Sequence, residues 1–168
     1  MIGDVLLLSL FPGAMALAAA SDLFTMRVPN ALAIALAAGF FLAAPLAGLG
    51  WPEIGLHLGL AAIALAIGFG LFAFGWIGGG DAKLFAATCL WLGSEAILTY
   101  AIYATVIGGV LTLALLTWRA MPLPASLASQ GWLVRLHRPN EGVPYAIALA
   151  ASGLLVYPHT PFMAVLGA

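Results

Sequence analysis

Long apolar runs separated by short polar stretches are the dominant pattern of this chain. The runs cover residues 2–20, 31–49, about 52–76, 82–93, 100–118 and 143–165. All but the fourth are close to the length of about 20 residues that an α-helix needs to cross a bilayer. The fourth is expected either to be tilted or to reach Leu98. The pattern therefore predicts an all-α polytopic membrane protein with about six transmembrane helices.

The composition leads to the same class of protein. Of 168 residues, 64% are hydrophobic and 7% are charged, whereas soluble domains carry roughly 25% charged residues. Six spans with short loops leave no room for a separate soluble domain, so we expect one membrane-embedded domain over residues 1–168. The single cysteine, Cys89, lies inside an apolar run, which excludes a disulfide framework and a cysteine-based zinc site.

The charges separate by side when the six segments alternate across the membrane. One side receives all five basic residues, namely Arg27, Lys83, Arg119, Arg135 and Arg138. By the positive-inside rule this side is cytoplasmic. Six crossings then place both termini on the extracytoplasmic side. His57 and His159 also fall on that far side, and we assign them no chemistry.

Two aspartates are predicted to lie at the same depth on the basic side. Asp22 closes the first segment and Asp81 opens the fourth. If the two helices are neighbours, the carboxyls meet in a low dielectric, where they share one proton and titrate as a unit. Aspartyl hydrolysis needs this state, because one carboxyl acts as base and the other as acid. Glu141 is the less favoured third carboxylate on this side.

The glycines at 78–80 could give backbone, water and an extended substrate access to Asp81. The plainer alternative is that they break a helix and that Asp81 caps the next one, while Asp22 is a loop acid paired with Arg27. A phosphate-binding loop is excluded because Asp81 stands where its lysine is required. We expect no nucleic-acid partner.

Two other classes of function stay open at this point. A proton-coupled small transporter also keeps acids near a glycine break, although it is expected to place them nearer the midplane of the bilayer. A non-catalytic membrane scaffold has no need for Asp22 and Asp81 on one side.

Three short stretches resemble one family, the type IV prepilin peptidases. The stretch GGGDAKL matches their GxGDxKL form of the GxGD motif of membrane aspartyl peptidases, at Gly78, Gly80, Asp81, Lys83 and Leu84. The stretch SDLFTMRVPN is similar to their other active-site segment, at Asp22, Arg27, Pro29 and Asn30. The stretch VPYAIALA is similar to the entry of their last helix, at Pro144 and Tyr145. The three occur in the family's order over most of the chain.

The resemblance implies an aspartic endopeptidase with Asp22 and Asp81 as catalytic residues and no metal or cofactor. It implies that the remaining motif residues bind substrate or shape the site, namely Gly78, Gly80, Lys83, Arg27, Pro144 and Tyr145. The chain lacks the paired CxxC region of the large bifunctional members. It is thus most similar to the short Flp, or tight-adherence, type, for which no methyltransferase activity is expected.

The implied partners are the lipid bilayer and a prepilin or pseudopilin. The enzyme would cut the short basic leader just before an apolar helix, at the cytoplasmic face of the bacterial inner membrane. Within the loop of residues 119–142, the stretch 126–142 mixes apolar and basic side chains, which suits an interfacial segment on anionic lipid. The oligomeric state and the particular pilin are left open.

Overall fold

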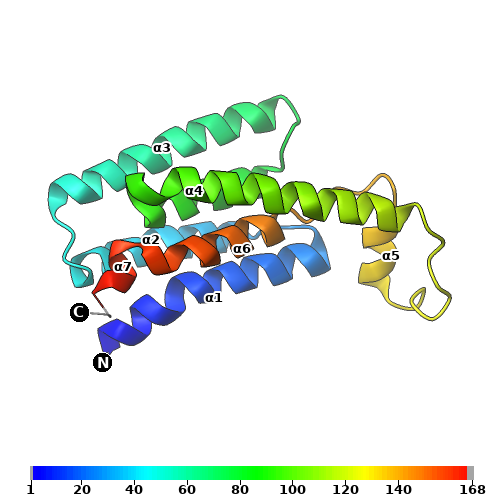
Figure 1. Ribbon diagram of the computed structural model, residues 1–168, viewed down its shortest axis with the longest axis horizontal. Coiled ribbons are helices and arrows are strands. Elements are labelled where there is room, and N and C mark those ends of the chain that lie inside the picture. The colour runs from blue at the N-terminus through cyan, green and yellow to red at the C-terminus, as the bar shows by residue number, and fades with distance from the viewer. Residues whose placement is uncertain (1, 166–168) are drawn as a thin grey trace.

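The computed structural model describes residues 2–165, apart from the side chains of residues 2, 4 and 6. Within this range the chain forms helices and no strand. The elements are α1 (Ile2–Thr25), α2 (Asn30–Leu46), α3 (Trp51–Ala73), α4 (Gly79–Arg119), α5 (Gly131–His137), α6 (Ala146–Val156), the 3-10 turn η1 (Tyr157–His159) and α7 (Pro161–Ala164). The long helices lie side by side along one axis, and α5 lies at one end of the bundle (Figure 1). The predicted all-α class is confirmed.

The element α4 consists of two helical arms that fold back on each other at Gly93. Gly93 has φ 68° and ψ −176°, which no helix contains. The rings of Phe85 and Tyr100 stack with their centroids 5.3 Å apart, whereas in one continuous helix these residues would be about 22 Å apart along the axis. The arms therefore cover residues 79–92 and 94–119. The predicted fourth and fifth segments are both present, but they begin earlier than residues 82 and 100.

The apolar helices account for a multi-pass membrane protein. Three helices are long and apolar enough to cross a bilayer, namely Leu7–Thr25, Trp51–Ala73 and Gly79–Arg119, and two shorter apolar helices cover Asn30–Leu46 and Ala146–His159. Because Gly79–Arg119 reverses at Gly93, the described residues make six passes along the bundle. The last pass is shorter than the predicted 143–165. Its regular helix starts only after Pro144 and gives way to a 3-10 turn at Pro158, since proline disfavours the helical conformation before it and removes a backbone donor.

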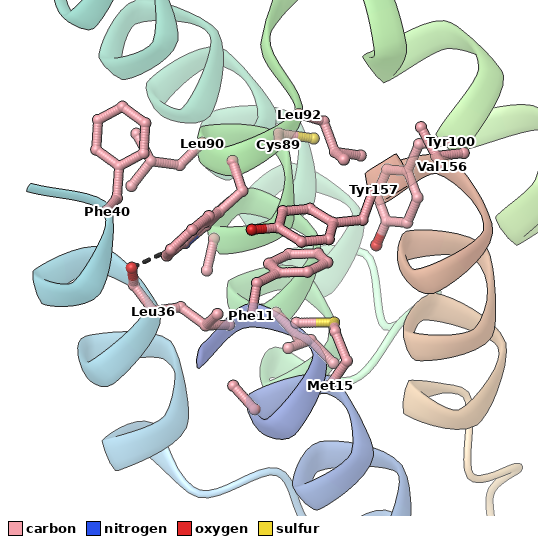
Figure 2. Packing of buried hydrophobic residues seen from close by; sticks show 14 of the residues in the cluster. Phe11, Met15, Leu36, Phe40, Cys89, Leu90, Leu92, Tyr100, Val156 and Tyr157 are labelled. Carbon is pink, nitrogen blue, oxygen red and sulfur yellow. Dashed lines mark hydrogen bonds between the residues drawn. The ribbon is translucent and has the colours of Figure 1, made fainter. Parts of the chain in front are cut away.

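The core lies where α1, α2, the first arm of α4 and the end of α6 meet. Aromatic and aliphatic side chains from these helices and from η1 interdigitate there, including Phe11, Phe40 and Tyr157 (Figure 2). The indole N–H of Trp91 donates to the Leu36 carbonyl at 2.9 Å, so the largest buried side chain has its one donor satisfied. Many leucines, isoleucines and phenylalanines are instead exposed on the outside of the bundle. Such a surface suits lipid rather than water.

One end of the bundle, which we call the charged end, carries all five Lys and Arg residues with Asp22, Asp81 and Glu141. It is formed by the end of α1, the starts of α2, α4 and α6, the end of α4, and α5 (Figure 1). There α5 rests on the bundle through an edge-on contact between Trp132 and Phe24, with ring centroids 5.3 Å apart. The start of α1 and α7 lie at the opposite end (Figure 1). The Gly93 reversal packs there against His57 in the first part of α3.

Candidate active site

Asp22 is a buried carboxylate in the last turn of α1, with 6% of its surface exposed. Its Oδ2 atom accepts a hydrogen bond of 2.9 Å from the backbone N–H of Ala146. Ala146 is the first residue of α6, where backbone N–H groups have no partner within the helix. The carboxylate therefore satisfies an otherwise unpaired donor and is held at the positive end of the α6 dipole. This contact joins the first and last passes of the bundle at the charged end.

Asp81 lies in the first turn of α4, and the glycines before it leave room for close approaches. A Cβ atom on Gly78 would lie 2.8 Å from Oδ2 of Asp81, and one on Gly80 would lie 3.1 Å from Cβ of Val28. Gly78 itself has an ordinary φ of −72°. The first glycine thus makes space for the carboxylate, and the second lets the loop after α1 pack against the start of α4.

The two aspartates line the same pair of polar cavities. The larger cavity, of about 800 Å³, is bounded by residues 75–78 and by the segment from Glu141 to Tyr145. The other, of about 700 Å³, is bounded by residues 25–30 and by the three glycines. The structure therefore brings together two carboxyls that are distant in sequence, in a place that water can reach.

A third cavity also reaches Asp81, and it is apolar. It has a volume of about 210 Å³ and lies between α3, both arms of α4 and α6. Tyr145 lines both this cavity and the larger polar one. The hydroxyl of Tyr145 donates to the Ala104 carbonyl at 3.0 Å, and its ring packs against Gly108. Tyr145 is thus a fixed partition between a polar and an apolar space. Pro144, directly before it, is buried.

The other motif residues are spread around the polar cavities. Nζ of Lys83 donates to Oδ1 of Asn30 at 2.9 Å, which links the two aspartate-bearing stretches across the start of α2. Arg27 is exposed and lines a further polar cavity of about 530 Å³ together with Arg135 and Glu141. Lys83 therefore has a protein partner, while the Arg27 side chain faces an open space.

The part played by Arg119 was not predicted from the sequence. Its guanidinium donates three hydrogen bonds to backbone carbonyls, to Leu136 at 2.8 Å, to Glu141 at 2.9 Å and to Gly142 at 2.7 Å. These bonds hold the segment that forms one wall of the larger polar cavity. The available signal was an arginine at the end of a long apolar helix just before a polar loop, because its five donors in a fixed fork can bind several carbonyls at once.

The contact of Asp22 with the Ala146 N–H was also missed. Pro144 shortly before the last helix was the signal, since it marks a helix start whose first N–H groups need outside acceptors.

As for metal ions, no group of three or more His, Cys, Asp or Glu side chains comes together within the residues that the structure describes.

Fold and site together define a multi-pass membrane protein with two aspartates facing shared polar cavities at one end of its bundle. The chain belongs to the type IV leader peptidase family, which matches residues 9–113. The matched segment contains Asp22 and Asp81 and ends before Pro144. No curated protein and no solved structure gives a significant match to the chain. The predicted membership of the prepilin peptidase family is therefore confirmed, and with it type IV leader peptidase activity in the general sense.

Proposed function

We propose that this protein is an aspartic endopeptidase that removes the short basic leader of prepilins or pseudopilins at the cytoplasmic face of the bacterial inner membrane. Asp22 and Asp81 are its catalytic residues. The observation that carries the proposal is that these two carboxyls, from α1 and α4, line the same polar cavities at the end of the bundle that holds every Lys and Arg. By the positive-inside rule this end faces the cytoplasm.

The reaction follows from two carboxyls that share one proton. The ionised carboxylate takes a proton from a water molecule as the water oxygen attacks the scissile carbonyl carbon, and the protonated carboxyl donates a hydrogen bond to the carbonyl oxygen. The tetrahedral intermediate then breaks its carbon–nitrogen bond. The leaving nitrogen takes up a proton from the pair Asp22 and Asp81, which we call the dyad. The two polar cavities supply space for the water and for an unwound stretch of substrate.

The position of the acids favours a peptidase over a proton-coupled transporter. Asp22 lies near the end of α1 at Thr25, and Asp81 lies near the start of α4 at Gly79. Transporter sites lie near the bilayer midplane, where discontinuous helices meet. Two acids at the edge of the bundle instead suit a substrate that is polar up to the membrane and apolar within it.

A cleavage assay tests the proposal. The purified protein, reconstituted in liposomes, is mixed with a synthetic precursor that has a short basic leader followed by an apolar helix, and the products are identified by mass. We expect cleavage at the end of the leader that survives EDTA, without methyl transfer from S-adenosylmethionine. Loss of cleavage in EDTA that zinc restores would overturn the aspartic mechanism. Methylation of the product would overturn the assignment to the short type.

The side of the membrane is tested by cysteine accessibility in oriented vesicles. The native Cys89 is fully buried, so it gives little background labelling. Arg135→Cys at the charged end should be labelled from the cytoplasmic side, and Glu53→Cys at the start of α3 should be labelled from the other. The reverse pattern would place the aspartates on the wrong side for a cytoplasmic leader.

A further inference from the structure

The apolar cavity beside Asp81 is not needed for the chemistry of the dyad, yet it opens onto it. Asp81 lines this cavity and both polar ones, so all three spaces border this residue. Apart from Asp81, Thr105 and Tyr145, every side chain in its wall is apolar, including Ile67, Phe85 and Ala101. The space is thus unsuited to water or to a charged leader, and suited to an apolar group attached to whatever occupies the dyad.

Resting on the proposed function, we propose that this cavity is the subsite for the apolar side chain on the carboxyl side of the scissile bond. We further infer that its volume decides which side chain is accepted there. The substrate changes from polar to apolar at the bond that is cut, and the site changes from polar to apolar at Asp81. With the scissile carbonyl at the dyad, the leader lies in the polar cavities and the first apolar side chain points into the apolar one.

The size of the cavity fits one side chain. An apolar cavity of about 150 Å³ is large enough to bind benzene, and this one has about 210 Å³. It therefore accepts a single aromatic ring or a branched aliphatic group and leaves an alanine side chain poorly packed.

The position of the cavity fits a substrate that arrives through the bilayer. Ile67 on α3 is 57% exposed, and Thr105 on the second arm of α4 is also exposed. Both line the cavity, so the cavity reaches the lipid-facing surface between these helices. A substrate helix in the membrane can deliver its first apolar side chain here without carrying it across the charged end. Tyr145, fixed by its bond to the Ala104 carbonyl, separates this route from the polar space.

The test uses one precursor in versions that differ only in the residue after the scissile bond, which is Phe, Leu, Ala or Trp. Wild type is compared with Ala101→Leu, which fills the cavity, and with Ile67→Ala, which enlarges it. The matched controls are Ala114→Leu and Ile63→Ala, which make the same exchanges at exposed positions of the same two helices that do not line the cavity. The measurement is kcat/KM for each pair of enzyme and substrate.

We expect wild type to prefer Phe and Leu over Ala. Ala101→Leu should lower the ratio of kcat/KM for Phe to that for Ala by about 10-fold or more, since a methylene in an apolar subsite changes discrimination by about that factor. Ile67→Ala should raise kcat/KM for Trp relative to Leu. Both controls should keep the wild-type ratios.

Two results would overturn the inference while leaving the proposed function intact. In the first, Ala101→Leu and Ile67→Ala cleave with unchanged substrate ratios. In the second, both variants lose activity equally toward all four substrates, as when the cavity holds a lipid chain or serves only packing. The enlarging variant keeps the test decisive if Ala101→Leu does not fold. If wild type cleaves none of the four, the proposed function itself fails.

Discussion

Glycine interrupts the helices at both ends of the first α4 arm, and the two interruptions have opposite surroundings. At residues 78–80 the chain borders two polar cavities, and Gly78 has ordinary backbone angles. At Gly93 the backbone has φ 68°, and a Cβ atom there would lie 2.7 Å from the imidazole of His57. The first break is open and presents a carboxyl, whereas the second is closed and reverses the chain.

At the closed break, neighbouring side chains fill the space around Gly93 and complete the hydrogen bonding of the backbone. Carbonyls in the last turn of a helix lack a partner within the helix, and Nδ1 of His57 donates to one of them, Leu90, at 2.7 Å. Phe40 stacks on the imidazole, with ring centroids 5.4 Å apart. A glycine break is thus structural where a side chain completes its hydrogen bonds. It is available for function where space is left in front of it.

The largest expected effect comes from the open break and its partner. Asp22→Asn or Asp81→Asn should lower kcat by about 10²–10⁴-fold, because neither amide can take a proton from water or supply one to the leaving group. The double variant should lose little more than either single one, since the two carboxyls act as a unit.

The assay is precursor cleavage by folded protein, and Glu141→Gln is the internal control. Glu141 lines the larger polar cavity but is assigned no proton transfer, so its variant should stay within about threefold of wild type. Substantial turnover by a well-folded Asp81→Asn protein would contradict the aspartic mechanism. The glycines and Asp81 would then only end one helix and start the next.

The next effect comes from the closed break and should appear in stability. Gly93→Ala forces a side chain into a positive φ, at a cost of about 1–3 kcal/mol, and also into the imidazole of His57. We expect a clear fall in the midpoint of thermal unfolding in detergent, with activity lost in proportion to the folded fraction. An unchanged midpoint would show that the reversal at Gly93 is not tightly packed.

The matching exchange at the open break should have the opposite signature. Gly78→Ala introduces no backbone strain, but its Cβ atom would lie 2.8 Å from Oδ2 of Asp81 and must displace the carboxyl. Because a shift of about 1 Å in a catalytic group can cost about 10²-fold in rate, we expect kcat to fall while the unfolding midpoint stays near the wild-type value. A lower midpoint with normal kcat in the folded fraction would remove the distinction between the two breaks.

Much of the fold and the core of the site could be predicted from the sequence, for physical reasons. The bilayer fixes the length of each apolar run, and alternation then places Asp22, Asp81 and all the basic residues at one end. What the sequence did not reveal depends on contacts between passes. Helices that are apolar all round give no periodic signal of which face meets which neighbour. The part of His57 in closing the Gly93 reversal was therefore not foreseen, and neither was the bond from Ala146 to Asp22.

The hydrogen bonds of Arg119 are also contacts between separate parts of the chain that the sequence does not reveal. Of the exchanges at the aspartates, Gly93, Gly78 and Arg119, the one at Arg119 should have the smallest effect. Arg119→Lys keeps the positive charge at the end of α4 but cannot reach the carbonyls of Leu136, Glu141 and Gly142 together, because an ammonium lacks the planar fork. The wall of the larger polar cavity should loosen, while Asp22 and Asp81 stay in place. We expect KM for the precursor to rise by about 10-fold, and kcat and the unfolding midpoint to change little, because the lost bonds hold a wall of the cavity rather than the reacting groups.

The control for Arg119→Lys is Arg138→Lys, the same exchange at an exposed position in the segment between α4 and α6. It should leave both constants near the wild-type values. An equal rise in KM in the two variants would mean that the effect does not depend on the three carbonyl contacts of Arg119. A fall in kcat with unchanged KM would mean that Arg119 positions the aspartates themselves. The open break would then depend on the loop before α6 as closely as the Gly93 reversal depends on His57.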